Sequence, residues 1–261
     1  MIERSEFKFE ICANSVESCL AAQEAGADRV ELCAGIPEGG TTPSYGEIAM
    51  ARRMLQSTKL HVIIRPRGGD FLYCKLELDR MAIDIDVCQS LGVDGVVFGC
   101  LAADGTPDLP ALQRLQRHAR GMSVTFHRAF DQCSHPMEAM RQIASLGFNR
   151  ILTSGQQPTA DRGVALLKQL QDQASENIAI MAGCGVNERN IASIYRATGI
   201  KEYHFSARVS RPSAMQARNT AVSMGSPAVD DHTTSVTSAG RVRATMEALL
   251  HSTASSSCSA E

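Results

Sequence analysis

Thiol and carboxylate side chains occur together at the ends of two short apolar segments. Glu10 and Cys12 end the first segment, and Glu31 and Cys33 end the second, each pair two residues apart. Residues two apart on a strand share a face, and adjacent strands lie about 4.7–4.9 Å apart. If the two thiols lie at equal height, they could hold one soft ion between them, and soft thiolates favour Cu(I). The sequence therefore predicts a metal site at Cys12 and Cys33.

Basic and imidazole side chains end several later segments. Carboxylates and imidazoles can act as general acids and bases, and arginines can bind anions. The candidate catalytic residues are Glu10, Glu31 and His127, and the arginines that could neutralise the glutamates or clamp an anion are Arg65, Arg67 and Arg128. A buried ion network that only closes the end of the fold is the structural alternative.

A third group follows the last two apolar segments. Gly183 and Gly185 flank Cys184, and His204 precedes Ser206 by two residues. Loops in such places often offer backbone amides to a phosphate. Two glycines after a strand are also typical of a simple tight turn. We keep both interpretations of this segment.

The elements that must position these residues alternate between strand and helix. Strict alternation indicates a parallel sheet, and eight units in about 250 residues favour a closed TIM-type (β/α)8 barrel over an open doubly wound sheet. In a barrel the loops after the strands build the reactive face. The predicted strands are Phe7–Cys12, Arg29–Cys33, Lys59–Arg65, Gly95–Gly99, Ser123–His127, Arg150–Ser154, Ile178–Gly183 and Glu202–Ser206.

A glycine precedes four of these strands and suits the left-handed cap of the preceding helix. These glycines are Gly26, Gly92, Gly147 and Gly199. Apolar spacing predicts helices over Val16–Ala25, Ala139–Leu146 and, as a closing helix, Val242–Leu250. Residues 225–240 are rich in Ser, Thr and Asp and are expected to form a loop. We expect one barrel domain over residues 7–251 and a disordered Ser-rich tail over residues 252–261.

Composition excludes several classes of protein. A formal charge of -2 gives no basic excess, so we expect no nucleic-acid partner. The first ten residues lack the apolar stretch of a secretory signal, and no apolar run reaches 18 residues. We therefore expect a cytoplasmic protein with no membrane partner, which could also enter the nucleus by diffusion. Nine cysteines without C-x-x-C spacing then indicate reduced thiols rather than disulfides or structural zinc.

The motifs together resemble the copper homeostasis protein CutC family over about residues 9–225. The segments that carry the resemblance are Glu10–Cys12, Gly26–Cys33, Glu38–Ser44, Ile64–Phe71, Thr125–Asp131 and Leu152–Gly155. The resemblance implies a β/α barrel, a cytoplasmic homodimer or homotetramer, and Cu(I) binding. Cys12 and Cys33 match family positions, and Cys33 is the better candidate ligand. By contrast, Cys74, Cys100, Cys133 and Cys184 depart from the family pattern and are given no role.

Three hypotheses of function stay open. The first is a copper protein that binds Cu(I) through Cys12 and Cys33, with a third ligand from His127 or His204. The second is a barrel enzyme acting on a small anionic, carbonyl or phosphorylated substrate, in which His127 carries a proton. The third is an oligomeric scaffold whose charged groups only hold one another. The sequence does not decide whether the chain is an enzyme.

Overall fold

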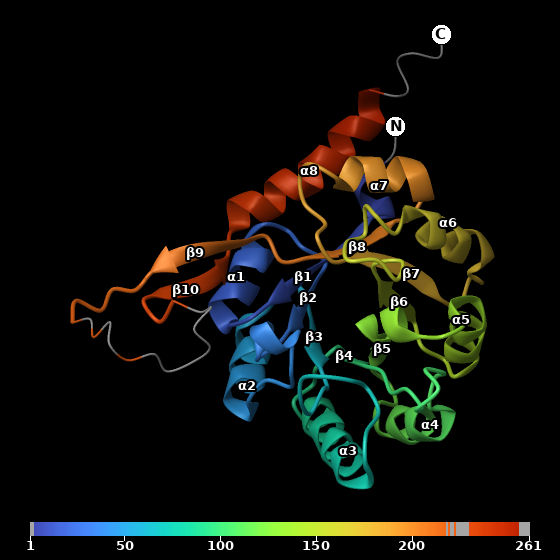
Figure 1. Ribbon diagram of the computed structural model, residues 1–261. Coiled ribbons are helices and arrows are strands. Elements are labelled where there is room, and N and C mark those ends of the chain that lie inside the picture. The colour runs from blue at the N-terminus through green and yellow to red at the C-terminus, as the bar shows by residue number, and fades with distance from the viewer. Residues whose placement is uncertain (1–2, 218, 220–221, 223–229, 256–261) are drawn as a thin grey trace.

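Eight parallel strands close into a barrel in the computed structural model, which describes residues 3–217, 219, 222 and 230–255 (Figure 1). The pairing of β1 with β8 closes the sheet, so the open doubly wound alternative is wrong. The observed strands match the predicted ones to within two residues at each end. They are β1 Lys8–Ala13, β2 Arg29–Leu32, β3 Lys59–Ile63, β4 Gly95–Phe98, β5 Ser123–Phe126, β6 Arg150–Thr153, β7 Ala179–Gly183 and β8 Glu202–Phe205.

Helices surround the barrel, each placed between or after the strands. Hydroxyl and carboxylate side chains cap several of them: Ser15, Ser44 and Asp108 each accept a hydrogen bond from a backbone N–H of the first turn. All four glycines predicted to have left-handed backbone do have positive φ. The helices are α1 Val16–Glu24, α2 Tyr45–Met54, α3 Lys75–Ser90, α4 Leu109–His118, α5 Pro136–Ser145, α6 Val164–Gln173, α7 Ile191–Thr198 and α8 Ala239–Ser255, with short 3-10 turns η1 Arg4–Glu6, η2 Ile36–Glu38 and η3 Arg128–Gln132.

The strands separate two environments. Side chains such as Ile11, Val62 and Ile180 point outward and are buried beneath the helices in the main apolar core. The alternate side chains along each strand point into the barrel, and in β1, β2, β5 and β8 most of them are polar. This polar interior, which branched apolar residues fill in most barrels, is what positions the candidate site.

A two-stranded antiparallel sheet follows the barrel and was not predicted. Its strands are β9 Arg208–Pro212 and β10 Thr233–Thr237, which extend away from the barrel beside α1 (Figure 1). The loop expected over residues 225–240 is therefore wrong for residues 233–237, because pairing with β9 overrides their turn-like composition. The closing helix α8 runs to Ser255, and the predicted disordered tail lies mostly outside the described residues.

Within the described part of the chain, none of the helices is both long enough and apolar enough to cross a bilayer.

Candidate functional site

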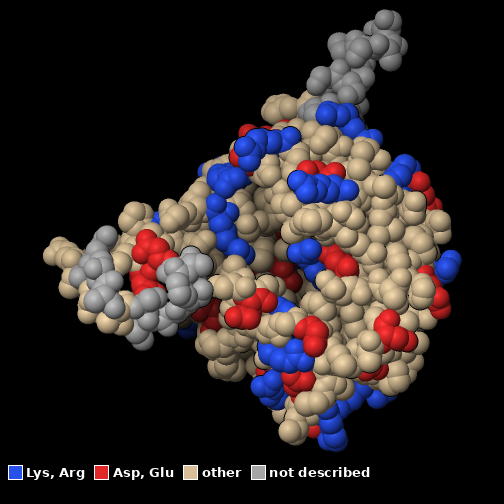
Figure 2. Space-filling model, viewed as in Figure 1, with Lys and Arg blue, Asp and Glu red and all other residues tan. Residues whose placement is uncertain are grey.

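A cavity of about 440 Å³ opens at the carboxyl ends of the strands. The space-filling view shows a hollow in the face that it presents, where β1, β2 and β8 meet, with acidic and basic side chains around it (Figure 2). Six arginine and glutamate residues line the cavity, together with two histidines. They are Glu31, Arg65, Arg128, Glu188, Arg208 and Arg241, with His127 and His204.

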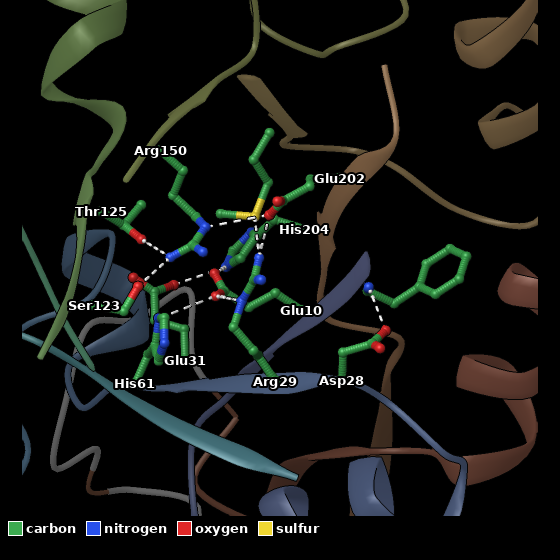
Figure 3. Close-up of polar contacts among 12 residues, drawn as sticks. Glu10, Asp28, Arg29, Glu31, His61, Ser123, Thr125, Arg150, Glu202 and His204 are labelled. Atoms are coloured by element: carbon green, nitrogen blue, oxygen red, sulfur yellow. Dashed lines mark hydrogen bonds and ion pairs between the residues drawn. The ribbon is translucent and has the colours of Figure 1, made fainter. Parts of the chain in front are cut away.

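An ion network fills the barrel below this cavity (Figure 3). The Arg29 guanidinium donates from Nε to Glu10 Oε2 at 2.8 Å and from Nη2 to Glu202 Oε2 at 2.6 Å. Arg150 donates from Nε to the same Glu202 oxygen at 3.2 Å. His61 lies on the other side of Glu10, with 3.4 Å between Nδ1 and Oε2. These residues join five strands, β1, β2, β3, β6 and β8, through the barrel interior.

Glu10 is held ionised in this network. Burial by itself would raise the pKa of Glu10, but the charges of Arg29, His61 and His204 outweigh it and lower the pKa to about 2. The carboxylate is fully buried and bonded to Arg29, so it is a structural charge rather than a proton donor near neutral pH. This arrangement favours the structural alternative for Glu10, although its catalytic role stays a prediction.

The expected partners of the two glutamates were wrong. Neither Glu10 nor Glu31 pairs with Arg65, Arg67 or Arg128: Glu10 pairs with Arg29, and Glu31 with His204. Barrel geometry explains the difference, because Arg29 and Glu10 lie opposite each other on β2 and β1. The arginines of the later loops lie above that layer and have partners of their own.

Each of those three arginines is fixed by its own loop. Arg65 donates from Nη1 and Nη2 to the backbone carbonyl oxygens of residues 38, 40 and 69. Arg67 is bonded to Glu77 and Asp70 and does not line the cavity. Arg128 lines the cavity and pairs with Asp131. Of the three, only Arg65 and Arg128 lie where an anion in the cavity could reach them.

The two thiols do come together, but at unequal height. Cys12 lies opposite Glu31 on β2, so Cys33 is displaced by two residues along its strand. The stagger of the barrel strands nevertheless brings the two Sγ atoms to 3.9 Å. Ligand atoms of Cys12, Glu31 and Cys33 all lie within 4.8 Å of one another, which is one of two such groups among the described residues.

The two thiols differ in their proton affinity. The hydrogen bond from the Cys33 thiol is the largest cause that lowers the pKa of Cys12 well below its ordinary value, against the effect of burial and with help from His204 and Arg208. The same hydrogen bond, together with burial, raises the pKa of Cys33 well above its ordinary value. A guanidinium N–H of Arg208 also donates to Cys12 Sγ at 3.1 Å. Cys12 is therefore the thiol of the pair that loses its proton more readily.

An acid–base pair lies beside the thiols. His204 Nε2 and Glu31 Oε2 are 2.7 Å apart, both buried. Burial alone would lower the pKa of His204, but Glu31 and Cys12 raise it well above its ordinary value. Burial raises the pKa of Glu31, with His204 acting against it. The pair can hold a proton between the two side chains at the edge of the cavity.

The third group of candidate residues, Gly183, Gly185, His204 and Ser206, brings fewer residues to the cavity than expected. Gly185, His204 and Ser206 line it, while Gly183 lies at the end of β7 outside the lining. The carbonyl oxygen of Gly185 accepts from the side chains of Asn187 and Asn190, which fixes the loop. A phosphate cradle in this loop stays a prediction.

Gly183 instead makes room for its neighbours inside the barrel. A Cβ at this position would lie 2.4 Å from Leu152 Cδ1 and 3.2 Å from His204 Cβ. We expect Gly183→Ala to lower the free energy of unfolding by about 1–3 kcal/mol, because a packed interior resists an added methyl group. Urea unfolding would measure this effect.

The matched control is Gly46→Ala in α2. The nearest atom to a Cβ there is 4.0 Å away, and the helix gains from losing a glycine by about 0.5–1 kcal/mol. Equal stability changes in the two variants would show that the interior around His204 is not tightly packed.

Several residues of the site were missed. Arg29 and Glu202 share strand parity with Glu31 and His204, and this parity could have found them; no candidate on β6 points to Arg150 in the same way. No local signal identifies Arg208 or Arg241, which come after the eighth strand and reach the cavity through β9 and α8.

The fold and site define a (β/α)8-barrel protein with a small cavity at the carboxyl ends of its strands, and thiols and arginines are among the side chains that line it. The CutC family model matches residues 7–209. The chain belongs to the CutC family.

Relatives cover nearly the whole chain. A CutC family protein of Bacteroides thetaiotaomicron is 62% identical over 245 residues, which is 94% of this chain and 98% of that protein. The human copper homeostasis protein cutC homolog is 44% identical over 238 residues, covering 91% of this chain and 87% of the human protein. The crystal structure of a copper homeostasis protein CutC from Streptococcus agalactiae has a TM-score of 0.74 at 35% identity, covering 77% of this chain and 98% of that one.

Proposed function

We propose that this chain takes part in copper homeostasis by binding Cu(I) through Cys12 and Cys33. The observation that supports the proposal is that the two Sγ atoms lie 3.9 Å apart and that both cysteines line the cavity. Metal–thiolate bonds of about 2.3 Å span such a gap with one ion between the sulfurs. The names of the human and streptococcal relatives support the same function.

The surrounding charges fit a copper–thiolate group. One Cu(I) ion bound by two thiolates carries a net charge of -1, and the Arg208 guanidinium beside Cys12 can neutralise it. Glu31 completes a group of three ligand atoms that lie within 4.8 Å of one another, but its hard oxygen suits Cu(I) poorly. Two thiolates are therefore the proposed ligand set, in a cytoplasmic homo-oligomer.

The test is a titration of the reduced protein with Cu(I) in the presence of a competing chelator. One equivalent should bind tightly and withdraw copper from the chelator. A protein that leaves all copper with the chelator would contradict the proposal.

A second function is favoured by the size and charge of the cavity. A volume of about 440 Å³ suits a small organic molecule, whereas an ion fills only a fraction of it. Arg65 and Arg208 line the cavity without a carboxylate partner among the described residues, so an anionic ligand would neutralise the charges of their guanidinium groups. We propose that the cavity binds a small organic anion, with the Glu31–His204 pair available as its general acid and base.

Thermal shift with small phosphorylated and carboxylated metabolites tests this second function. A ligand present at 100 times its Kd should stabilise the fold by about 2.7 kcal/mol. If none of these compounds raises the melting temperature, the cavity is not an anion site, and the charged groups then serve only as a scaffold.

A further inference from the structure

One wall of the cavity carries two buried N–H groups without acceptors. Arg65 Nε and His127 Nε2 are both shielded from solvent and have no hydrogen-bond partner among the described residues. Both side chains line the cavity and pack against Phe71, with 5.0 Å from the Arg65 guanidinium carbon to the Phe71 ring centre and 5.0 Å between the ring centres of Phe71 and His127. Buried N–H groups in proteins nearly always have a partner, so this wall is complete only with one more molecule present.

The backbone fixes which nitrogen of His127 carries the proton. His127 Nδ1 accepts a hydrogen bond from the backbone N–H of Ala129 at 3.2 Å, as the cap of η3. A neutral imidazole with Nδ1 as acceptor has its proton on Nε2. Burial, and then the charge of Arg65, lower the pKa of His127 to about 3, so the ring is neutral near pH 7. Nε2 is a donor only, and this differs from the proton-carrying role expected from the sequence.

Arg65, like His127, offers a hydrogen-bond donor and no acceptor. Arg65 uses three of its five N–H groups, two on Nη1 and one on Nη2, on backbone carbonyl oxygens, and its buried Nε–H has no acceptor among the described residues. A wall that offers donors only is best matched by a group that only accepts. Carbonyl and carboxylate oxygens only accept, whereas a hydroxyl group brings a donor that this wall cannot satisfy.

We propose that His127 selects a carbonyl oxygen in the ligand of this cavity: its Nε2–H donates to a ketone or aldehyde oxygen of a small organic anion. The inference rests on the second proposed function and names its ligand class. His127 then acts as a binding and specificity-determining residue, and no proton is transferred by it.

The first test examines the free protein and needs no ligand. Nitrogen-15 NMR of the histidine rings should find His127 with Nε2 protonated and Nδ1 unprotonated from pH 7 down to about pH 4. A ring protonated on Nδ1 alone, or charged at pH 6, would overturn the proposal.

The second test compares two pairs of probes that differ only at the oxygen. Dihydroxyacetone phosphate and glycerol 3-phosphate form one pair, and pyruvate and lactate form the other. The carbonyl member of at least one pair should bind about three- to tenfold more tightly, which is the size of one net hydrogen bond. In His127→Phe the preference should disappear, and in His127→Gln, which keeps a side-chain donor, it should partly return.

The outcomes separate the two proposals. Binding of both members with equal affinity in the wild type, or a preference that persists in His127→Phe, overturns the role of His127 and leaves the anion site standing. Absence of binding by all four probes counts against the anion site and the inference together. Melting temperatures of the ligand-free variants show whether each one is folded.

Discussion

Replacing Arg29 with Met is expected to lower the free energy of unfolding by about 3–5 kcal/mol, the cost of removing one partner from a buried ion pair. Arg29 bonds both Glu10 and Glu202, and its side chain is 7% exposed while that of Glu10 is fully buried. Without the guanidinium, the ion-pair partners left to the Glu10 carboxylate among the described residues are the imidazoles of His61 and His204. Urea unfolding at pH 7 measures the loss.

An exposed arginine provides the matched control. Arg243 pairs with Glu24 at 3.3 Å, and both side chains are largely exposed. Arg243→Met should change stability by less than about 1 kcal/mol, because solvent screens such pairs. If Arg29→Met lowers the free energy of unfolding by as little as this control does, the ion network in the barrel interior contributes little to the stability of the fold.

The stability difference between wild type and Arg29→Met should also depend on pH. The folded-state pKa of Glu10 is about 2, below its ordinary value of 4.5, so its stabilising effect is present above pH 4.5 and is lost as the pH falls through 2. In the variant, burial without Arg29 raises the pKa of Glu10, and protonation then relieves the buried charge. The difference in unfolding free energy should therefore narrow between pH 7 and pH 4. A constant difference would show that Glu10 is not the source of the loss.

Removing either thiol of the cavity should lower the affinity for Cu(I) by at least about 100-fold. Loss of groups that only support a metal ligand already costs up to about 100-fold, and here a ligand itself is lost. The 3.9 Å contact makes the pair one unit, so Cys12→Ser and Cys33→Ser should each reduce binding about as much as the double variant. Competition with a Cu(I) chelator measures all three.

The exposed Cys74 is the control thiol. Cys74→Ser should leave the affinity for Cu(I) unchanged, because this thiol lies at the start of α3 and does not line the cavity. Tight binding that survives in the Cys12→Ser, Cys33→Ser double variant would refute the metal site. Anion binding could still stand, because the arginines of the cavity do not depend on the thiols as ligands.

The local patterns determined most of the fold. The alternation of apolar strands and helices, and the glycines that end helices, predicted all eight strands, because strand parity and helix caps depend on residues close together in sequence. The same parity placed Cys12, Cys33 and Glu31 on one face. The sequence by itself thus determined which side chains could meet at the mouth of the barrel.

Only the tertiary structure decided which of them do meet. The stagger between β1 and β2 sets Cys12 opposite Glu31 and Glu10 opposite Arg29, and no local pattern encodes this register. β9 forms only because β10 pairs with it some 20 residues further along the chain. Through β9, the structure adds Arg208 to Cys12 and Cys33, and this guanidinium adds to the larger effect of the Cys33 hydrogen bond in lowering the pKa of Cys12. Partners distant in sequence require a closed barrel to bring them together, which is why the thiols were predictable and their electrostatic environment was not.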